Sequence, residues 1–224
     1  MSADRRLSLV AGLLYLVTFA TSIPALALKQ PFLDGASGVD STALRAASGL
    51  EIVLALACLG TAVALFPIVR RRSELLAVGF LGSRALEAGL VLLGVVGMLA
   101  VPSVGSDVSA RAALVALHDW AFLIGPGLLP AVNAALLGSA LLRARLIPRV
   151  IPLVGLVGAP LLAVSACGTL FGWFDQVSVW GAVGALPIAL WELALGVWLT
   201  VRGVGEAAPV VSSLSYSASG VAAR

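Results

Sequence analysis

The chain contains few charged residues. Asp, Glu, Lys and Arg together make up only 11% of its 224 residues, whereas 60% are hydrophobic and the mean hydropathy is +1.08. These values lie well outside the range of a soluble globular domain. The composition therefore excludes a soluble fold and indicates a protein whose surroundings are a lipid bilayer.

Cysteine and histidine are also scarce, which limits the metal and cofactor chemistry available to the chain. It has two cysteines, Cys58 and Cys167, and one histidine, His118. Both cysteines fall inside apolar runs, where a thiol behaves as a small buried group, and a disulfide between them requires those runs to touch. No zinc-ligand spacing, phosphate loop or cofactor fingerprint is present. We predict no metal site and no bound cofactor.

Long apolar runs make up most of the sequence. A bilayer is crossed by about 20 mainly apolar residues in a helix, because backbone polar groups in hydrocarbon must be paired within the segment. Six runs satisfy this length: 7–28, 46–69, 75–101, 112–142, 150–172 and 178–201. We predict an all-α integral membrane bundle of six transmembrane helices, forming one domain over residues 1–203. The Ser-rich remainder, residues 204–224, is predicted to be a disordered cytoplasmic tail.

The fourth run contains residues that interrupt helices. The segment "IGPGLLPAVN" at 124–133 includes Gly125, Pro126, Gly127 and Pro130. Proline removes a backbone hydrogen bond and clashes with the preceding turn, so the fourth helix is predicted to be kinked or broken there. Such a bend serves either close packing or a cavity lined by freed carbonyls.

The distribution of arginine predicts the orientation of the chain. Nine of the 14 basic residues lie before the first run, in alternate connections or after the last run: Arg5, Arg6, Arg70, Arg71, Arg72, Arg143, Arg145, Arg149 and Arg202. Because basic residues are enriched on the cytoplasmic side, both termini are predicted to be cytoplasmic. The net charge of +3 and the pI near 9.4 then follow from topology and give no indication of nucleic-acid binding.

The first run permits a second interpretation, as a cleaved signal sequence. It combines basic "MSADRR", an apolar stretch and "ALA" at 25–27. The stretch is longer than the usual 7 to 15 residues or so, and Pro24 directly precedes the cleavage motif. These two features favour a retained helix.

Two charges lie deep inside the third run. At a rise of about 1.5 Å per residue from position 75, Arg84 lies about 13 Å deep and Glu87 about 18 Å deep. A charge at this depth should face the bundle interior and be paired. Because the two residues are three positions apart, they share a helix face, and we expect an ion pair between them.

Further polar residues occur in the other runs: Glu51, His118, Asp119, Asn133 and Glu192. We expect Glu51, Arg84, Glu87, His118 and Asp119 to line one cavity, since each would be costly facing lipid. Adjacent helical residues point about 100° apart, so positions 118 and 119 do not themselves predict a pair. Two alternatives stay open: the charges only fix helix packing, and His118 only caps backbone near the membrane interface.

Four segments resemble a known family. They are "RLSLVAGLLYLVTFATSIPAL", "RALEAGLVLLG", "LHDWAFLIGPGLLPAVNAALLGSALLRARLIPR" and "PIALWELALGVWLTVRG". Together they make the chain similar, over about residues 5 to 203, to the small bacterial multipass membrane proteins grouped as domain of unknown function 4386. The resemblance implies a six-helix protein of a bacterial inner membrane and implies no activity.

Three classes of function remain. The favoured one is binding or transport of a small amphipathic, lipophilic or cationic molecule through a polar intramembrane cavity. The second is a membrane enzyme that uses Asp119, Glu87 or Glu192 as an acid or base on a lipophilic substrate such as an isoprenoid. The third is a structural partner protein, for which the charges serve assembly. Six helices without visible repeats are few for alternating access unless the chain forms a homo-oligomer.

Overall fold

The computed structural model describes residues 1–33 and 41–205, and these residues contain helices and no strand. The elements in chain order are α1 (Ala3–Leu33), α2 (Ser41–Arg70), α3 (Glu74–Ala100), the short 3₁₀ helix η1 (Val101–Val104), α4 (Val108–Ile124), α5 (Leu129–Ala144), α6 (Val150–Leu170) and α7 (Val179–Val201). They supply six segments long and apolar enough to cross a membrane, so the predicted all-α bundle is confirmed. The predicted disordered tail lies outside the described residues from position 206 onward.

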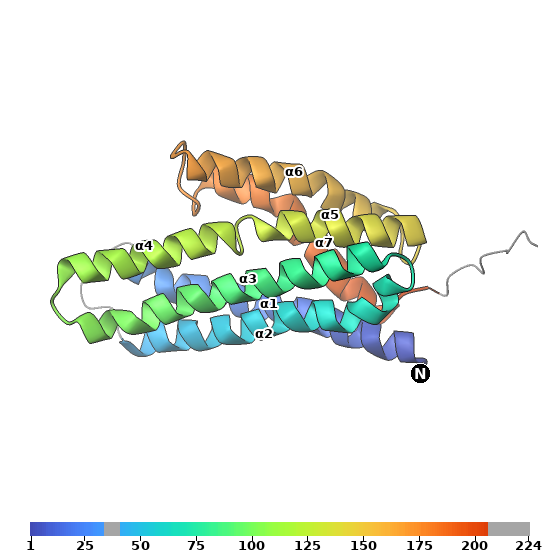
Figure 1. Ribbon diagram of the computed structural model, residues 1–224, viewed down its shortest axis with the longest axis horizontal. Coiled ribbons are helices and arrows are strands. Elements are labelled where there is room, and N and C mark those ends of the chain that lie inside the picture. The colour runs from blue at the N-terminus through green and yellow to red at the C-terminus, as the bar shows by residue number, and fades with distance from the viewer. Residues whose placement is uncertain (34–40, 206–224) are drawn as a thin grey trace, which may run out of the picture.

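The helices form an elongated bundle (Figure 1). α2 packs between α1 and α3, and α4 and α5 follow one another along α3. α6 and α7 form a hairpin that packs on α5 and α1, while α6 makes only sparse contacts with α4. In Figure 1 the end of the hairpin remote from the N-terminus diverges from α4. The bundle is therefore closed near the N-terminus and more open at the other end.

The fourth predicted run is two helices separated by a turn. α4 ends at Ile124, residues 125–128 form the turn, and α5 begins at Leu129 with Pro130 in its first turn. Proline is tolerated there because the first N–H groups of a helix lack intrahelical acceptors. A Cβ at Gly127 would overlap the carbonyl oxygen of Leu123, so this close approach requires glycine.

The main hydrophobic core fills the half of the bundle nearest the N-terminus. Its fully buried members include Tyr15, Leu65, Phe80 and Trp191. α6 approaches α7 closely because Gly155 offers no side chain: a Cβ there would lie 2.6 Å from the Trp191 ring. Small residues at helix contacts allow this kind of packing in membranes.

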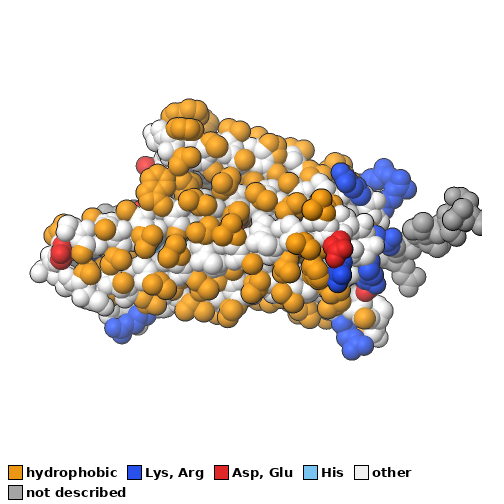
Figure 2. Space-filling view, in the orientation of Figure 1, with side chains coloured by type: hydrophobic (Ala, Val, Ile, Leu, Met, Phe, Trp, Pro, Cys, Tyr) orange, Lys and Arg blue, Asp and Glu red, His pale blue; other side chains and the backbone are white. Residues whose placement is uncertain are grey.

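The exterior combines an apolar surface with charge at one end (Figure 2). Lys and Arg side chains gather mainly at the end that holds the N-terminus, here called the arginine-rich end, and hydrophobic side chains cover the length between the ends. Trp173 and Trp180 lie exposed at the opposite end, on the connection between α6 and α7 and at the start of α7. This distribution is typical of a multi-pass membrane protein.

One expectation about the cysteines needs correction. Cys58 is buried in α2, but Cys167 is exposed on α6, and both thiols are free. α6 packs mainly against α5 and α7, so the rest of its circumference, including Cys167, faces outward.

Candidate functional site

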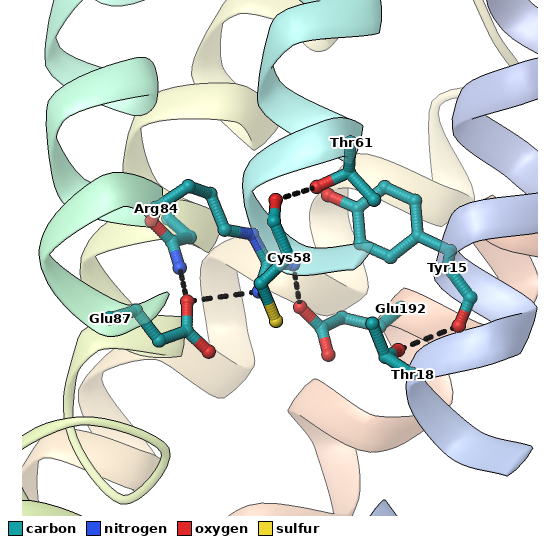
Figure 3. A network of polar contacts seen from close by, with 8 residues as sticks. Tyr15, Thr18, Cys58, Thr61, Arg84, Glu87 and Glu192 are labelled. Atoms are coloured by element: carbon teal, nitrogen blue, oxygen red, sulfur yellow. Dashed lines mark hydrogen bonds and ion pairs between the residues drawn. The ribbon is translucent and has the colours of Figure 1, made fainter. Parts of the chain in front are cut away.

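Arg84 lies at the centre of a buried ion-pair cluster. It stands ten residues after the first residue of α3, Glu74, and only 1% of its side chain is exposed. Its Nη1 donates to Glu87 Oε2 at 2.9 Å, which is the expected pair on one helix face. Its Nη2 donates to Glu192 Oε1, so a second carboxylate reaches it from α7 (Figure 3). We call Arg84, Glu87 and Glu192 the charge triad.

Side chains from three more helices surround the triad. Asn133 of α5 donates from Nδ2 to Glu87 Oε2 at 2.6 Å. Cys58 Sγ of α2 lies 3.7 Å from Arg84 Nη1, and the Tyr15 ring of α1 lies 5.2 Å from Arg84 Cζ in a cation–π arrangement. Five helices thus meet at the triad, four of them at the Arg84 guanidinium and α5 through Glu87, an arrangement that periodicity alone does not reveal.

The triad has more carboxylates than cations. Within the described chain, no Lys, Arg or His besides Arg84 contacts Glu87 or Glu192. With both carboxylates ionised, the triad carries a net charge of −1 inside an apolar bundle. Such a charge is costly unless a further positive charge joins it, which a proton or a bound cation can supply.

A second polar network, the outer chain, consists of Lys29, Glu51, His118 and Asp119 and joins α1, α2 and α4. Lys29 Nζ pairs with Glu51 Oε1 and lies 2.9 Å from His118 Nε2. His118 Nδ1 lies 3.0 Å from Asp119 Oδ1, although the two residues are neighbours on one helix. The Lys29 side chain is 1% exposed, whereas that of Asp119 is 57% exposed.

The donors and acceptors of the outer chain fix its charge. A lysine ammonium only donates, so His118 Nε2 accepts from Lys29 and Nδ1 carries the proton that is donated to Asp119. His118 is then neutral, and Lys29 and Glu51 neutralise one another. The uncompensated charge of the outer chain is the negative charge of Asp119.

Sequence reasoning missed Lys29. The first predicted run ends at residue 28, which leaves Lys29, the only lysine of the chain, just outside it. α1 instead continues to Leu33 and carries Lys29 into the bundle. The signal available in the sequence was Glu51, a buried acid that needs a cation from another helix.

Three neighbouring hollows, each of which shares lining residues with the next, lie between the regions of the two networks, and we call the series the intramembrane groove. The outer hollow, about 590 Å³, is lined by Lys29, His118 and Asp119 among others. The middle hollow, about 280 Å³, shares Phe122 and Gln176 with it. The inner hollow, about 200 Å³, reaches the triad. The middle and inner hollows share Pro126, Leu162 and Ala185.

The structure distributes the sequence-derived candidates over both ends of this groove. Arg84, Glu87 and Glu192 line its inner hollow, and His118 and Asp119 line its outer hollow. Glu51 and Asn133 lie behind them, as partners of Lys29 and Glu87. The five residues expected in one cavity thus belong to two networks, because α1 supplies Lys29 to one and α7 supplies Glu192 to the other. In the described part of the chain, no three His, Cys, Asp or Glu side chains are grouped as a metal site.

Comparison with known proteins identifies a family and no activity. The chain matches the family model described as "Domain of unknown function (DUF4386)" over residues 10–203, which extend from α1 to just beyond α7. No curated protein and no solved structure matches the chain. Since the match covers well over half of the chain, including both polar networks, the chain belongs to the DUF4386 family.

Proposed function

We propose that this protein binds a small amphipathic or lipophilic molecule in the intramembrane groove, and that this binding serves its transport or its presentation at the membrane. The observation that carries the proposal is the series of three hollows with shared lining residues between the outer chain and the charge triad. A set of charges that only fixes helix packing requires no such space beside it.

The walls of the groove suit an amphipathic molecule. Ligand sites combine mainly apolar walls with a few polar groups at defined points. The middle hollow is lined largely by apolar side chains such as Leu26, Phe122 and Leu162, whereas charged side chains lie in the outer and inner hollows. An apolar body fits between these two polar ends.

We further propose that the protein spans the cell membrane with both termini in the cytoplasm. The nine basic residues that lie before the first run, in alternate connections and after the last run support this orientation, since basic residues favour the cytoplasmic side. The outer hollow then opens on the far side of the membrane, and the triad lies near mid-membrane.

Blocking the groove tests binding. The neutral fluorescent probe N-phenyl-1-naphthylamine is titrated into the purified protein in detergent. Ala185 lines both the middle and the inner hollow, so Ala185→Trp should weaken probe binding at least about tenfold, or about 1.4 kcal/mol.

Val183 provides the matched control, because it is exposed on the same helix and lines none of the three hollows. Val183→Trp should leave probe binding unchanged. Equal binding by the Ala185→Trp variant and the unaltered protein would refute the groove as the binding site.

A further inference from the structure

We infer that the molecule bound in the groove is an organic cation, and that it displaces a proton from Glu192. This inference rests on the proposed function and specifies the chemistry of its ligand. It follows from the charges along the groove, the aromatic lining of the outer hollow and the composition of the triad.

The uncompensated charges that line the groove are all negative. Asp119 and Asp175 line the outer hollow, and the triad at the inner hollow has one more carboxylate than it has cations, so it is neutral while that carboxylate holds a proton and negative once the proton leaves. Among the described residues, the only lysine or arginine that lines the groove besides Arg84 is Lys29, whose charge Glu51 neutralises. This potential attracts cations and repels anions.

Aromatic rings lie beside these carboxylates. Trp120, Trp173 and Phe174 line the outer hollow together with Asp119 and Asp175. The faces of aromatic rings attract ammonium and other organic cations, most strongly when desolvated. Carboxylates alone would also suit a small hydrated cation, but rings and apolar walls favour a cation with a hydrocarbon body.

Glu192 is the carboxylate of the triad that can exchange its partner. Within the described residues it accepts a hydrogen bond from Arg84 alone, whereas Glu87 accepts one from Arg84 and one from Asn133. The Glu192 side chain is also more exposed, at 14% against 5% for Glu87. Both line the inner hollow, so Glu192 is the more accessible of the two to a ligand.

The side chains around Glu192 include one positive charge fewer than the carboxylates there require. Tyr15 of α1, Cys58 of α2 and Arg84 and Glu87 of α3 face the same cluster. The titratable side chains of α5 and α6 are Arg143, in the last turn of α5, and Cys167, which is exposed. In the part of the chain that the structure describes, Arg84 is therefore the only cation at the cluster, and it faces two carboxylates.

The exchange of a proton for an organic cation at Glu192 keeps the triad electrically neutral. Without ligand, a proton on Glu192 makes the triad neutral, because Arg84 then balances Glu87 alone. When an organic cation enters, the Glu192 O–H bond breaks, the proton leaves to water and the carboxylate pairs with the cation. One proton is released for each monovalent cation bound, and the buried charge is unchanged.

Two ions of nearly the same shape and opposite charge test the inference. Tetraphenylphosphonium and tetraphenylborate are titrated into the purified full chain in weakly buffered detergent, and proton release is followed with a pH indicator. We expect the cation to bind at least about tenfold more tightly than the anion. We also expect release of about one proton per cation and an affinity that rises about tenfold per pH unit, as linkage requires for one exchanged proton.

Substitutions test which residues are responsible for proton release and for the preference for the cation. Glu192→Gln keeps an acceptor for Arg84 and should abolish proton release and the pH dependence of binding. The control Glu74→Gln alters an exposed acid of the Arg70–Glu74 pair at the arginine-rich end and should change neither. The combined variant Asp119→Asn, Asp175→Asn does not touch the buried triad and should reduce the preference for the cation over the anion.

The possible failures are distinguishable. Equal affinity for both ions would overturn the cation inference while leaving groove binding in place. A preference for the cation without proton release, or proton release that persists in Glu192→Gln, would overturn the exchange at Glu192. Failure of both ions and of N-phenyl-1-naphthylamine to bind would overturn the proposed function itself.

Discussion

Glu87 and Glu192, which stand on α3 and α7, share the single guanidinium of Arg84. Arg84 Nη1 donates to Glu87 at 2.9 Å and Nη2 donates to Glu192, a residue 108 positions later in the chain. This shared contact joins α3 to α7. It also makes the stability of the protein depend above all on Arg84, because removal of Arg84 leaves both carboxylates without a cation.

Arg84→Met should destabilise the protein by about 3–5 kcal/mol, since it leaves two buried carboxylates without their cation. Loss of the native fold with temperature in detergent, followed by fluorescence-detected size exclusion, measures the effect. A triple variant, Arg84→Met with Glu87→Gln and Glu192→Gln, should recover much of the loss because no buried charge remains.

The exposed Arg70–Glu74 pair is the control for this experiment. Arg70→Met should change stability by no more than about 1 kcal/mol, because water screens an exposed ion pair. Arg84→Met protein as stable as the unaltered chain would contradict the buried triad.

Lys29→Met should destabilise the outer chain by leaving Glu51 buried and unpaired, by about 3–5 kcal/mol. Adding Glu51→Gln to that variant should restore part of the stability. A double-mutant cycle in detergent measures the coupling between the two side chains. Additive effects of the two substitutions would show that the residues do not interact.

Gly155→Ala should destabilise the protein by about 1–3 kcal/mol, because the added methyl group meets the Trp191 ring and overpacks the α6–α7 contact. Gly82 is a suitable control, since a Cβ there meets nothing within 4 Å. Gly82→Ala should be neutral or stabilising by up to about 1 kcal/mol, from helix propensity. Comparison of the two melting temperatures tests the packing, and equal shifts would contradict it.

Reporter fusions should place the two ends of α7 on opposite sides of the membrane. Green fluorescent protein fused after Arg202 should fluoresce, and alkaline phosphatase inserted after Gly172, between α6 and α7, should be active because that connection lies outside the cytoplasm. The reciprocal fusions serve as controls. Alkaline phosphatase activity after Arg202 would refute the proposed orientation.

The sequence by itself determined the number and type of the spans. Hydrocarbon forces a long apolar segment to satisfy its own backbone hydrogen bonds, so length and composition were sufficient for the six helical spans. The Arg84–Glu87 pair was predictable for a similar reason, since residues three apart on a helix share a face and the geometry is local. The likeness to the family also came from sequence and agrees with the family model.

Only the tertiary structure decided which helices supply the remaining partners. Glu192 joins Arg84 and Lys29 joins Glu51 through contacts between helices distant in sequence, and these depend on how each helix is rotated and staggered against its neighbours. In a chain that is apolar on most helix faces, hydrophobic periodicity gives little information about that rotation. The separation into two polar networks with a groove between them therefore required the packing of α1, α4 and α7, together with that of α6, which the close approach of Gly155 to Trp191 fixes against α7.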